Sequence, residues 1–338
     1  MTATSSPSAP RLRVRVTSAG LPGGLELFTP GGSMRWGNCD FTLNAPNDSE
    51  SDFWIVFGNA FPRETGRVAR ANTLFIAGEP PAKKVYPRGF YRQFEHIVDT
   101  HNTTGHPHVQ LDALGLCWMV GLSWKQSRFT IGYDALKQLT PPEKQNRVSV
   151  VCSTTAQTAG QRQRLKFLAA LKQRLGDDLM VFGKGFQQID DKLEATLPYR
   201  YHLVLENSQS PHYWTEKLTD AYLGWAFPLY VGCPNVGDYF APESVLPLDM
   251  NDVDGAVKTI RDLLAKPAAH DDLTVLRTAR EQVLDVYNPF ARFAHWANKF
   301  HQPGPKETVV MQSEKAFRFF RGWFYRQQHR NFSNQPVS

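Results

Sequence analysis

Carboxylate, amide, hydroxyl and ammonium side chains lie close together in the sequence between Glu206 and Lys217. An apolar run at residues 201–205 precedes them and predicts a β-strand. In open α/β sheets ligands bind beyond the carboxyl ends of the strands, which is where these polar residues would lie. Such a set of groups could hold a nucleotide-sugar, with a cation facing the diphosphate and a carboxylate accepting hydrogen bonds from sugar hydroxyls.

The residues after this strand also predict a helix whose N-terminus faces the same site. Ser210 is a suitable N-cap and Pro211 a suitable first helical residue. Tyr213, Glu216 and Lys217 would then share one face of the helix, and the N–H groups of its first turn would attract a phosphate. A solvated helix start explains the same residues equally well, and their spacing alone does not decide between the two interpretations.

Short apolar runs and helical patterns alternate through the rest of the chain, which predicts parallel sheets with helices on both faces. A proline-rich stretch at 139–146 is typical of a linker. We therefore expect an α/β fold with two Rossmann-like domains facing a cleft. The expected parts are a first α/β domain at 1–145, a nucleotide-sugar-binding domain at 146–302 and a basic aromatic tail at 303–338. The expected strands are 52–58, 72–78, 147–152, 179–183, 201–205 and 226–231, and the expected helices are 162–175, a segment ending near 223, and 253–264.

Composition excludes several classes of protein. The chain of 338 residues carries a net charge of +6, but its cations are scattered and form no nucleic-acid-binding motif. The four cysteines are widely spaced, so we expect buried, reduced thiols and a reducing compartment rather than disulfides or a zinc site. No apolar run is long enough to span a bilayer, which favours a cytoplasmic protein without a membrane anchor.

Two longer motifs resemble the α1,3/4-fucosyltransferase family, and the bacterial members without an anchor most of all. The run from Glu206 to Leu218 is similar to the family signature that contains ENS and TEK, although it departs from it at His212 and Trp214. The run from Phe227 to Ser244 resembles a second family motif. The similarity covers roughly residues 147–264, and the N-terminal half matches only at isolated points.

This resemblance implies roles for particular residues. Asn207, Tyr213, Glu216 and Lys217 fall on donor-binding positions of the family. An arginine on the first helix of the donor domain would contact the diphosphate, and Arg164 is the best match, with Arg162 as the alternative.

The resemblance also implies that the first domain, residues 1–145, lies on the acceptor side and supplies a general base. The family has a glutamate soon after a strand, and Glu79 occupies that setting here. A carboxylate at a strand end can accept the proton of an attacking hydroxyl. Glu79 could equally open a proline-rich turn, and Glu95 is the alternative carboxylate.

The implied function is an inverting glycosyltransferase that moves L-fucose from GDP-fucose to a glycan hydroxyl, in α1,3/4 linkage. One alternative is a glycosyltransferase that uses a different sugar nucleotide. The other is a non-catalytic nucleotide- or glycan-binding protein of the same fold. The acceptor would be an oligosaccharide or a glycolipid, and no nucleic acid partner is expected.

No cofactor or metal is expected besides the donor, because Asp252 and Asp254 resemble a metal-binding DxD motif but suit a helix start better. The tail, where aromatic residues alternate with cations, suits either packing on the first domain or contact with an anionic membrane surface.

Overall fold

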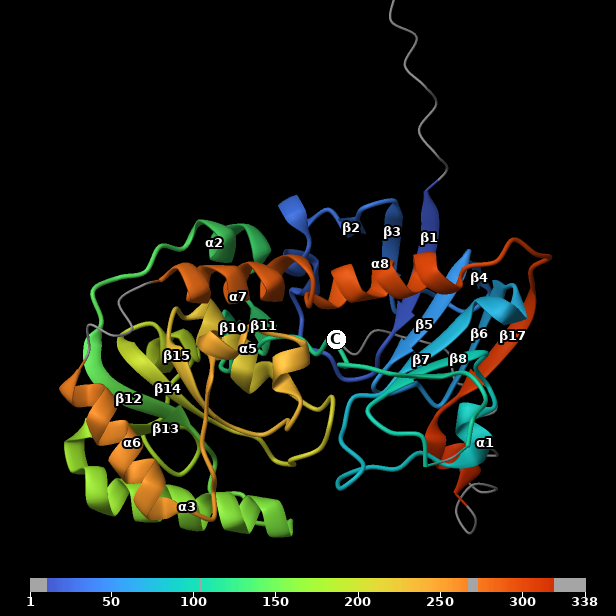
Figure 1. Ribbon diagram of the computed structural model, residues 1–338. Coiled ribbons are helices and arrows are strands. Elements are labelled where there is room, and N and C mark those ends of the chain that lie inside the picture. Colours follow the sequence, from blue (N-terminus) through green and yellow to red (C-terminus); the bar gives the residue numbers. More distant parts are fainter. Residues whose placement is uncertain (1–10, 104, 267–272, 319–338) are drawn as a thin grey trace, which may run out of the picture.

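The computed structural model describes residues 11–103, 105–266 and 273–318, and places two main sheets side by side (Figure 1). The first sheet has the strand order β2-β3-β1-β5-β7-β8-β9, and its neighbouring strands are parallel except for β2 and β3. Strands β5 and β7 are buried along their whole length, as their continuous apolar sequences predict. The strands are β1 (Leu12–Thr17), β2 (Arg35–Trp36), β3 (Cys39–Leu43), β5 (Phe53–Phe57), β7 (Thr73–Ile76), β8 (His96–Asp99) and β9 (Val109–Leu111).

The second sheet is parallel throughout, with the order β13-β12-β14-β15-β16. Helices lie on both sides of it, α3 beside α6 and α5 beside α7 (Figure 1). Its strands are β12 (Gln145–Val151), β13 (Leu179–Phe182), β14 (Tyr199–Leu205), β15 (Phe227–Val231) and β16 (Leu246–Pro247), and its helices are α3 (Ala159–Leu175), α4 (Leu193–Thr196), α5 (Glu216–Leu223), α6 (Val253–Ala265) and α7 (Thr274–Asp285). The strands and helices predicted for this half match those observed to within about three residues, except for the start of α5.

The chain returns to its first half after the second sheet. Helix α8 (Pro289–Phe300) packs against the first sheet, with the ring of Phe293 5.3 Å from that of Phe57. Strand β17 (Glu307–Gln312) then pairs antiparallel with β6 (Arg63–Val68), in a three-stranded sheet completed by β4 (Ser49–Glu50). Part of the segment predicted as a tail is therefore a strand. The boundaries predicted at 145/146 and 302/303 stay predictions.

A small hairpin and one short helix lie between the two halves. Strands β10 (Leu122–Ser123) and β11 (Arg128–Phe129) form the hairpin, α2 (Tyr133–Gln138) follows it, and α1 (Arg88–Tyr91) belongs to the first half. Residues 139–144 then lead into β12 in an irregular conformation, and the Nζ of Lys144 lies within hydrogen-bonding distance of four backbone carbonyls. The proline-rich stretch is thus held firmly against the second half.

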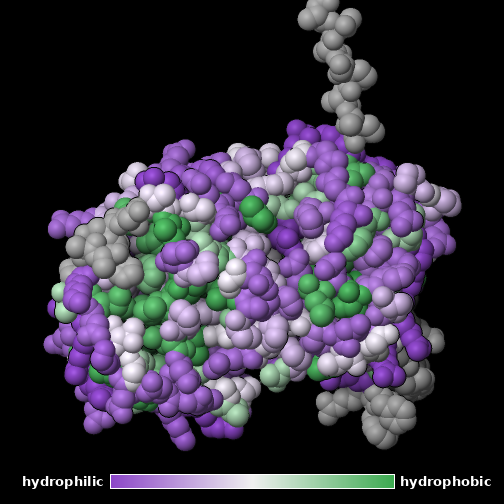
Figure 2. Space-filling model, in the orientation of Figure 1, coloured by the Kyte–Doolittle hydropathy of each residue, from purple (hydrophilic) through white to green (hydrophobic). Residues whose placement is uncertain are grey.

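The core and the surface agree with the composition. All four cysteines are buried and free, which confirms the prediction of buried thiols. The face shown in Figure 2 is mostly polar, with apolar residues gathered mainly over the half that holds the second sheet. None of the helices in the described part of the chain combines the length and apolar character needed to cross a bilayer.

The structure describes the aromatic tail as far as Arg318, and up to that residue the tail packs on the first half of the chain, as one of the two interpretations predicts. The side chain of Phe317 lies against Gly89, and its ring is 6.4 Å from that of Phe90 in α1. The rest of the tail lies outside the described residues.

Candidate functional site

Helix α5 begins at Glu216, with Thr215 as its N-cap. The predicted start at Ser210 and Pro211 is wrong because a buried carboxylate fixes the cap five residues later. Glu206, which directly follows β14, accepts hydrogen bonds from the backbone N–H of Thr215 at 2.8 Å and from its hydroxyl at 2.8 Å. His212 adopts a φ of 63°, which a continuous helix does not allow. Tyr213 therefore lies outside the helix, 3% exposed.

Lys217 lies between two carboxylates at the start of α5. Its Nζ is 3.0 Å from Oε1 of Glu216, 3.5 Å from Oε2 of Glu206 and 3.0 Å from the hydroxyl oxygen of Thr215. Burial alone would lower the pKa of the Lys217 ammonium, but the two carboxylates raise it above its usual value, so the side chain stays charged. The single ammonium group of Lys217 thus offsets the negative charge of two carboxylates. Binding of a further anion beside Lys217 therefore requires additional cations nearby.

The carboxylates of this cluster titrate differently. Burial raises the pKa of Glu206, which is 1% exposed, and Lys217 only partly opposes this. For Glu216, burial also acts to raise the pKa, but the nearby Lys217 and Lys192 bring it to about 2. Glu216 is thus an ionised hydrogen-bond acceptor at neutral pH.

A further cation comes from α3. Arg164 is 5% exposed, and its Nη1 donates a 2.7 Å hydrogen bond to Oδ1 of Asn207. Its Nε is buried and has no hydrogen-bond partner among the described residues. Gly160 permits the close approach of α3 to this loop, because a Cβ there would lie 2.7 Å from the carbonyl oxygen of Asn207. The alternative, Arg162, is exposed and donates to the carbonyls of Ala156 and Gln157.

These residues border one cavity of about 550 Å³ at the carboxyl ends of the second sheet. Four of the five predicted donor-binding residues line it, namely Arg164, Asn207, Glu216 and Lys217. The cavity has the charge needed to receive an anion and hydrogen-bonding groups for a sugar.

A second hollow of about 290 Å³ lies between the two halves and shares Asn207, Glu216 and Lys217 with the first. Tyr213 and Glu79 line this one. Glu79 follows β7, is 33% exposed, and forms an ion pair with Lys83. The structure thus brings the predicted base and the predicted donor-binding residues to adjoining hollows.

Glu95, the alternative base, lies elsewhere. It immediately precedes β8, which runs parallel to β7, so it lies at the opposite edge of the first sheet from Glu79. Its Oε1 is 3.0 Å from Nδ1 of His108.

Sequence reasoning missed Lys192. Its Nζ is 2.7 Å from Oδ2 of Asp220 and 3.7 Å from Oε1 of Glu216, and it lines the larger cavity. Asp220 in turn accepts hydrogen bonds from the backbone N–H groups of Met119 and Val120, at 2.7 and 3.0 Å. A lysine before a short helix carries no recognisable signal in the sequence, since its partners lie 24 and 28 residues away.

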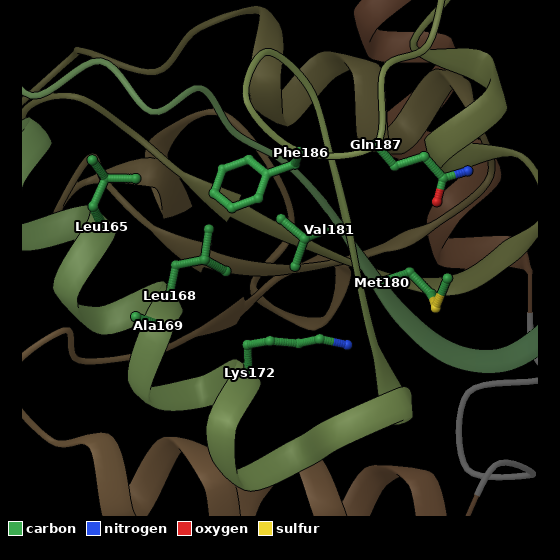
Figure 3. Close-up of a pocket in the computed structure, with 8 residues that line it drawn as sticks. All are labelled: Leu165, Leu168, Ala169, Lys172, Met180, Val181, Phe186 and Gln187. Atoms are coloured by element: carbon green, nitrogen blue, oxygen red, sulfur yellow. The ribbon is translucent and has the colours of Figure 1, made fainter.

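Another hollow of about 550 Å³ lies between α3 and β13 (Figure 3), but its chemistry is different. Leucine, valine, methionine and phenylalanine side chains dominate its lining, and Lys172 is the one charged residue in it. The Nζ of Lys172 donates to the carbonyls of Gly176 and Leu179, at 2.7 and 2.9 Å. This hollow therefore suits an anion less well than the cavity beside Lys217.

The DxD-like residues behave as predicted for a helix start. Asp252 is the N-cap of α6 and accepts a 2.8 Å hydrogen bond from the backbone N–H of Gly255. Asp254 forms an ion pair with Arg174 of α3.

The arrangement of sheets and helices is the first feature that defines the class of this protein. A solved structure of an α1,3-fucosyltransferase with GDP covers 90% of this chain and 96% of its own, with a TM-score of 0.50 and 19% identity. This likeness confirms the predicted α/β fold with two Rossmann-like domains, an architecture known as GT-B.

Sequence comparison then supports the predicted family resemblance. Residues 141–269 match the model of the C-terminal domain of glycosyltransferase family 10 (fucosyltransferase). An α-(1,3)-fucosyltransferase of Helicobacter pylori is 34% identical over 86 residues, which are 25% of this chain and 18% of that protein. A putative fucosyltransferase-like protein of Arabidopsis thaliana is 28% identical over 254 residues, 72% of this chain and 44% of that protein. The chain thus spans less than half the length of the curated relatives it matches.

Proposed function

We propose that this protein is an inverting glycosyltransferase that transfers L-fucose from GDP-fucose to a glycan hydroxyl in α1,3/4 linkage. The observation that carries the proposal is the convergence of Arg164 and Lys217 with Asn207 on one cavity at the carboxyl ends of the second sheet. The similarity to an α-(1,3)-fucosyltransferase of Helicobacter pylori, and to an α1,3-fucosyltransferase solved with GDP, supports the choice of fucose and GDP.

In the proposed reaction the acceptor hydroxyl oxygen bonds to C1 of the sugar while the bond from C1 to the diphosphate oxygen breaks. The hydroxyl proton passes to the carboxylate of Glu79, and GDP leaves with the electron pair of the broken bond. Glu79 suits this role because its hollow adjoins the cavity at Lys217. Arg164 and Lys217 would stabilise the negative charge that develops on the leaving diphosphate.

The same two cations are proposed to make a cofactor unnecessary, since they can offset the charge that a metal ion would otherwise neutralise.

For the acceptor we propose an oligosaccharide or a glycolipid, reaching Glu79 through the smaller hollow. A cytoplasmic location and peripheral contact of the tail with a membrane are retained as proposals from the sequence.

The donor is tested by thermal unfolding with GDP, UDP and CDP. We expect GDP to raise the melting temperature by several degrees, because a ligand present at 100 times its Kd stabilises the native state by about 2.7 kcal/mol. UDP and CDP should shift it less. A clear shift with UDP and none with millimolar GDP would favour the alternative of a different sugar nucleotide.

Arg164→Ala should weaken GDP binding by roughly 10-fold or more, because a buried charged hydrogen-bond donor is worth about 1.5–3 kcal/mol. Isothermal titration calorimetry measures the effect. Arg162→Ala is the matched control, since it removes a cation from the same helix at an exposed position and should leave affinity unchanged. Equal losses in both variants would point to a general effect of helix charge and against a contact at Arg164.

A further inference from the structure

An exposed tryptophan borders the proposed donor cavity. Trp124 lines it together with Gln188 and Ile189. Its side chain is 53% exposed, the largest fraction among the exposed large apolar side chains in the described part of the chain. An aromatic ring at the edge of a charged cavity offers a flat apolar face that the cations beside it do not provide.

The backbone that carries this ring is held in place from the second half of the chain. Trp124 lies in the turn between β10 and β11, and its N–H donates a 3.1 Å hydrogen bond to the carbonyl of Asp190. The Asp190 carboxylate accepts from the hydroxyl of Ser123 at 2.8 Å and from the N–H of Lys125 at 2.8 Å. The two residues that flank Trp124, Ser123 and Lys125, thus both donate hydrogen bonds to Asp190.

The position of Trp124 along the sheet suits one part of a nucleotide. Gln188, Ile189 and Asp190 belong to the segment after β13, whereas Asn207 and Lys217 follow β14. Strand β12 lies between β13 and β14. Neighbouring strands are about 4.8 Å apart, so β13 and β14, which lead into these two segments, are about 10 Å apart. In a nucleoside diphosphate the ribose separates base and diphosphate by a comparable length.

We propose that the indole of Trp124 stacks on the nucleobase of the donor, and that Asp190 is a positioning residue for the turn that carries it. The inference rests on the proposed function, because it assumes that the diphosphate binds at Arg164 and Lys217. Every nucleobase has a π-face, so this contact supplies affinity for the base, and groups at its edge must supply any choice between bases.

The test compares GDP with inorganic pyrophosphate, which carries the charge but no base. Trp124→Ala should weaken GDP binding by about 10-fold or more in calorimetry, since stacking of one base is worth about 1–3 kcal/mol. Pyrophosphate should bind Trp124→Ala as it binds the wild type, and Trp124→Phe should keep much of the GDP affinity. Phe186→Ala is the matched control, because that ring is also exposed but lines the apolar hollow of Figure 3.

Asp190→Ala tests the positioning role. It should weaken GDP binding in the wild-type background and cause no further loss in the Trp124→Ala background, because its effect acts through the ring. A further loss of GDP affinity in the Trp124→Ala background would show that Asp190 acts independently of the ring, and would overturn its positioning role.

Two results would overturn the stacking itself. Unchanged GDP affinity in Trp124→Ala, while the wild type binds GDP, would remove the inference and leave the proposed function standing. Equal loss of GDP and pyrophosphate would show that Trp124 supports the cavity as a whole. Absence of GDP binding by the wild type would remove the proposed function and this inference with it.

Discussion

Replacement of Glu79 by glutamine is expected to lower the turnover number by about 100-fold or more while GDP affinity stays near the wild-type value. Glutamine keeps the size of the side chain and its hydrogen bonding but has no basic lone pair to accept the acceptor's proton. The residue lines the smaller hollow and is absent from the lining of the larger cavity, so the diphosphate site should be unaffected. Initial rates of GDP release, measured beside calorimetry with GDP, separate the two effects.

Glu95→Gln is the matched control for this experiment. It removes a carboxylate from the opposite edge of the same sheet, and Glu95 lines neither of the two hollows that Lys217 borders. We expect near-normal turnover. Normal turnover in Glu79→Gln with a loss in Glu95→Gln would transfer the base to Glu95.

The same pair of variants decides between an enzyme and a binding protein. If the wild type binds GDP but no acceptor supports GDP release, and Glu79→Gln changes nothing measurable, the non-catalytic alternative is favoured. Loss of GDP binding in Glu79→Gln would instead give Glu79 a structural role, perturbing the cleft through its ion pair with Lys83.

The second half of the fold could be predicted because its signals are local. Its strands are apolar runs closed by polar turns, and the capping box at the start of α3, in which Thr158 and Gln161 bind one another's backbone, lies within four residues. Most of the candidate site follows from this half, since parallel strands bring their carboxyl ends together.

The predictions failed where a distant residue decides the local structure. The start of α5 depends on Glu206, nine residues before its cap. Strand β17 finds its partner β6 about 240 residues away, and the turn at Trp124 depends on Asp190. Such contacts join residues that lie far apart in the sequence and follow no local periodicity, so sequence patterns alone could not reveal Lys192 or Trp124.

Lys217→Met is expected to abolish detectable GDP binding and to lower turnover by roughly 100-fold or more, because the ammonium acts on the diphosphate in the ground state and more strongly as charge develops. The same change leaves the buried Glu206 carboxylate without its cation, which should cost about 3 kcal/mol of stability. Lys166→Met, at an exposed position on α3, is the control for loss of one positive charge and should change neither quantity.

A double variant separates the fold from the chemistry at Lys217. In Glu206→Gln/Lys217→Met no buried charge is left unpaired at Glu206, so urea unfolding should show much of the lost stability restored. GDP binding and turnover should stay lost, because the cation that faces the cavity is still missing. Recovery of GDP binding together with stability would mean that Lys217 serves only to neutralise Glu206, and the anion site would then have to depend on Arg164 alone.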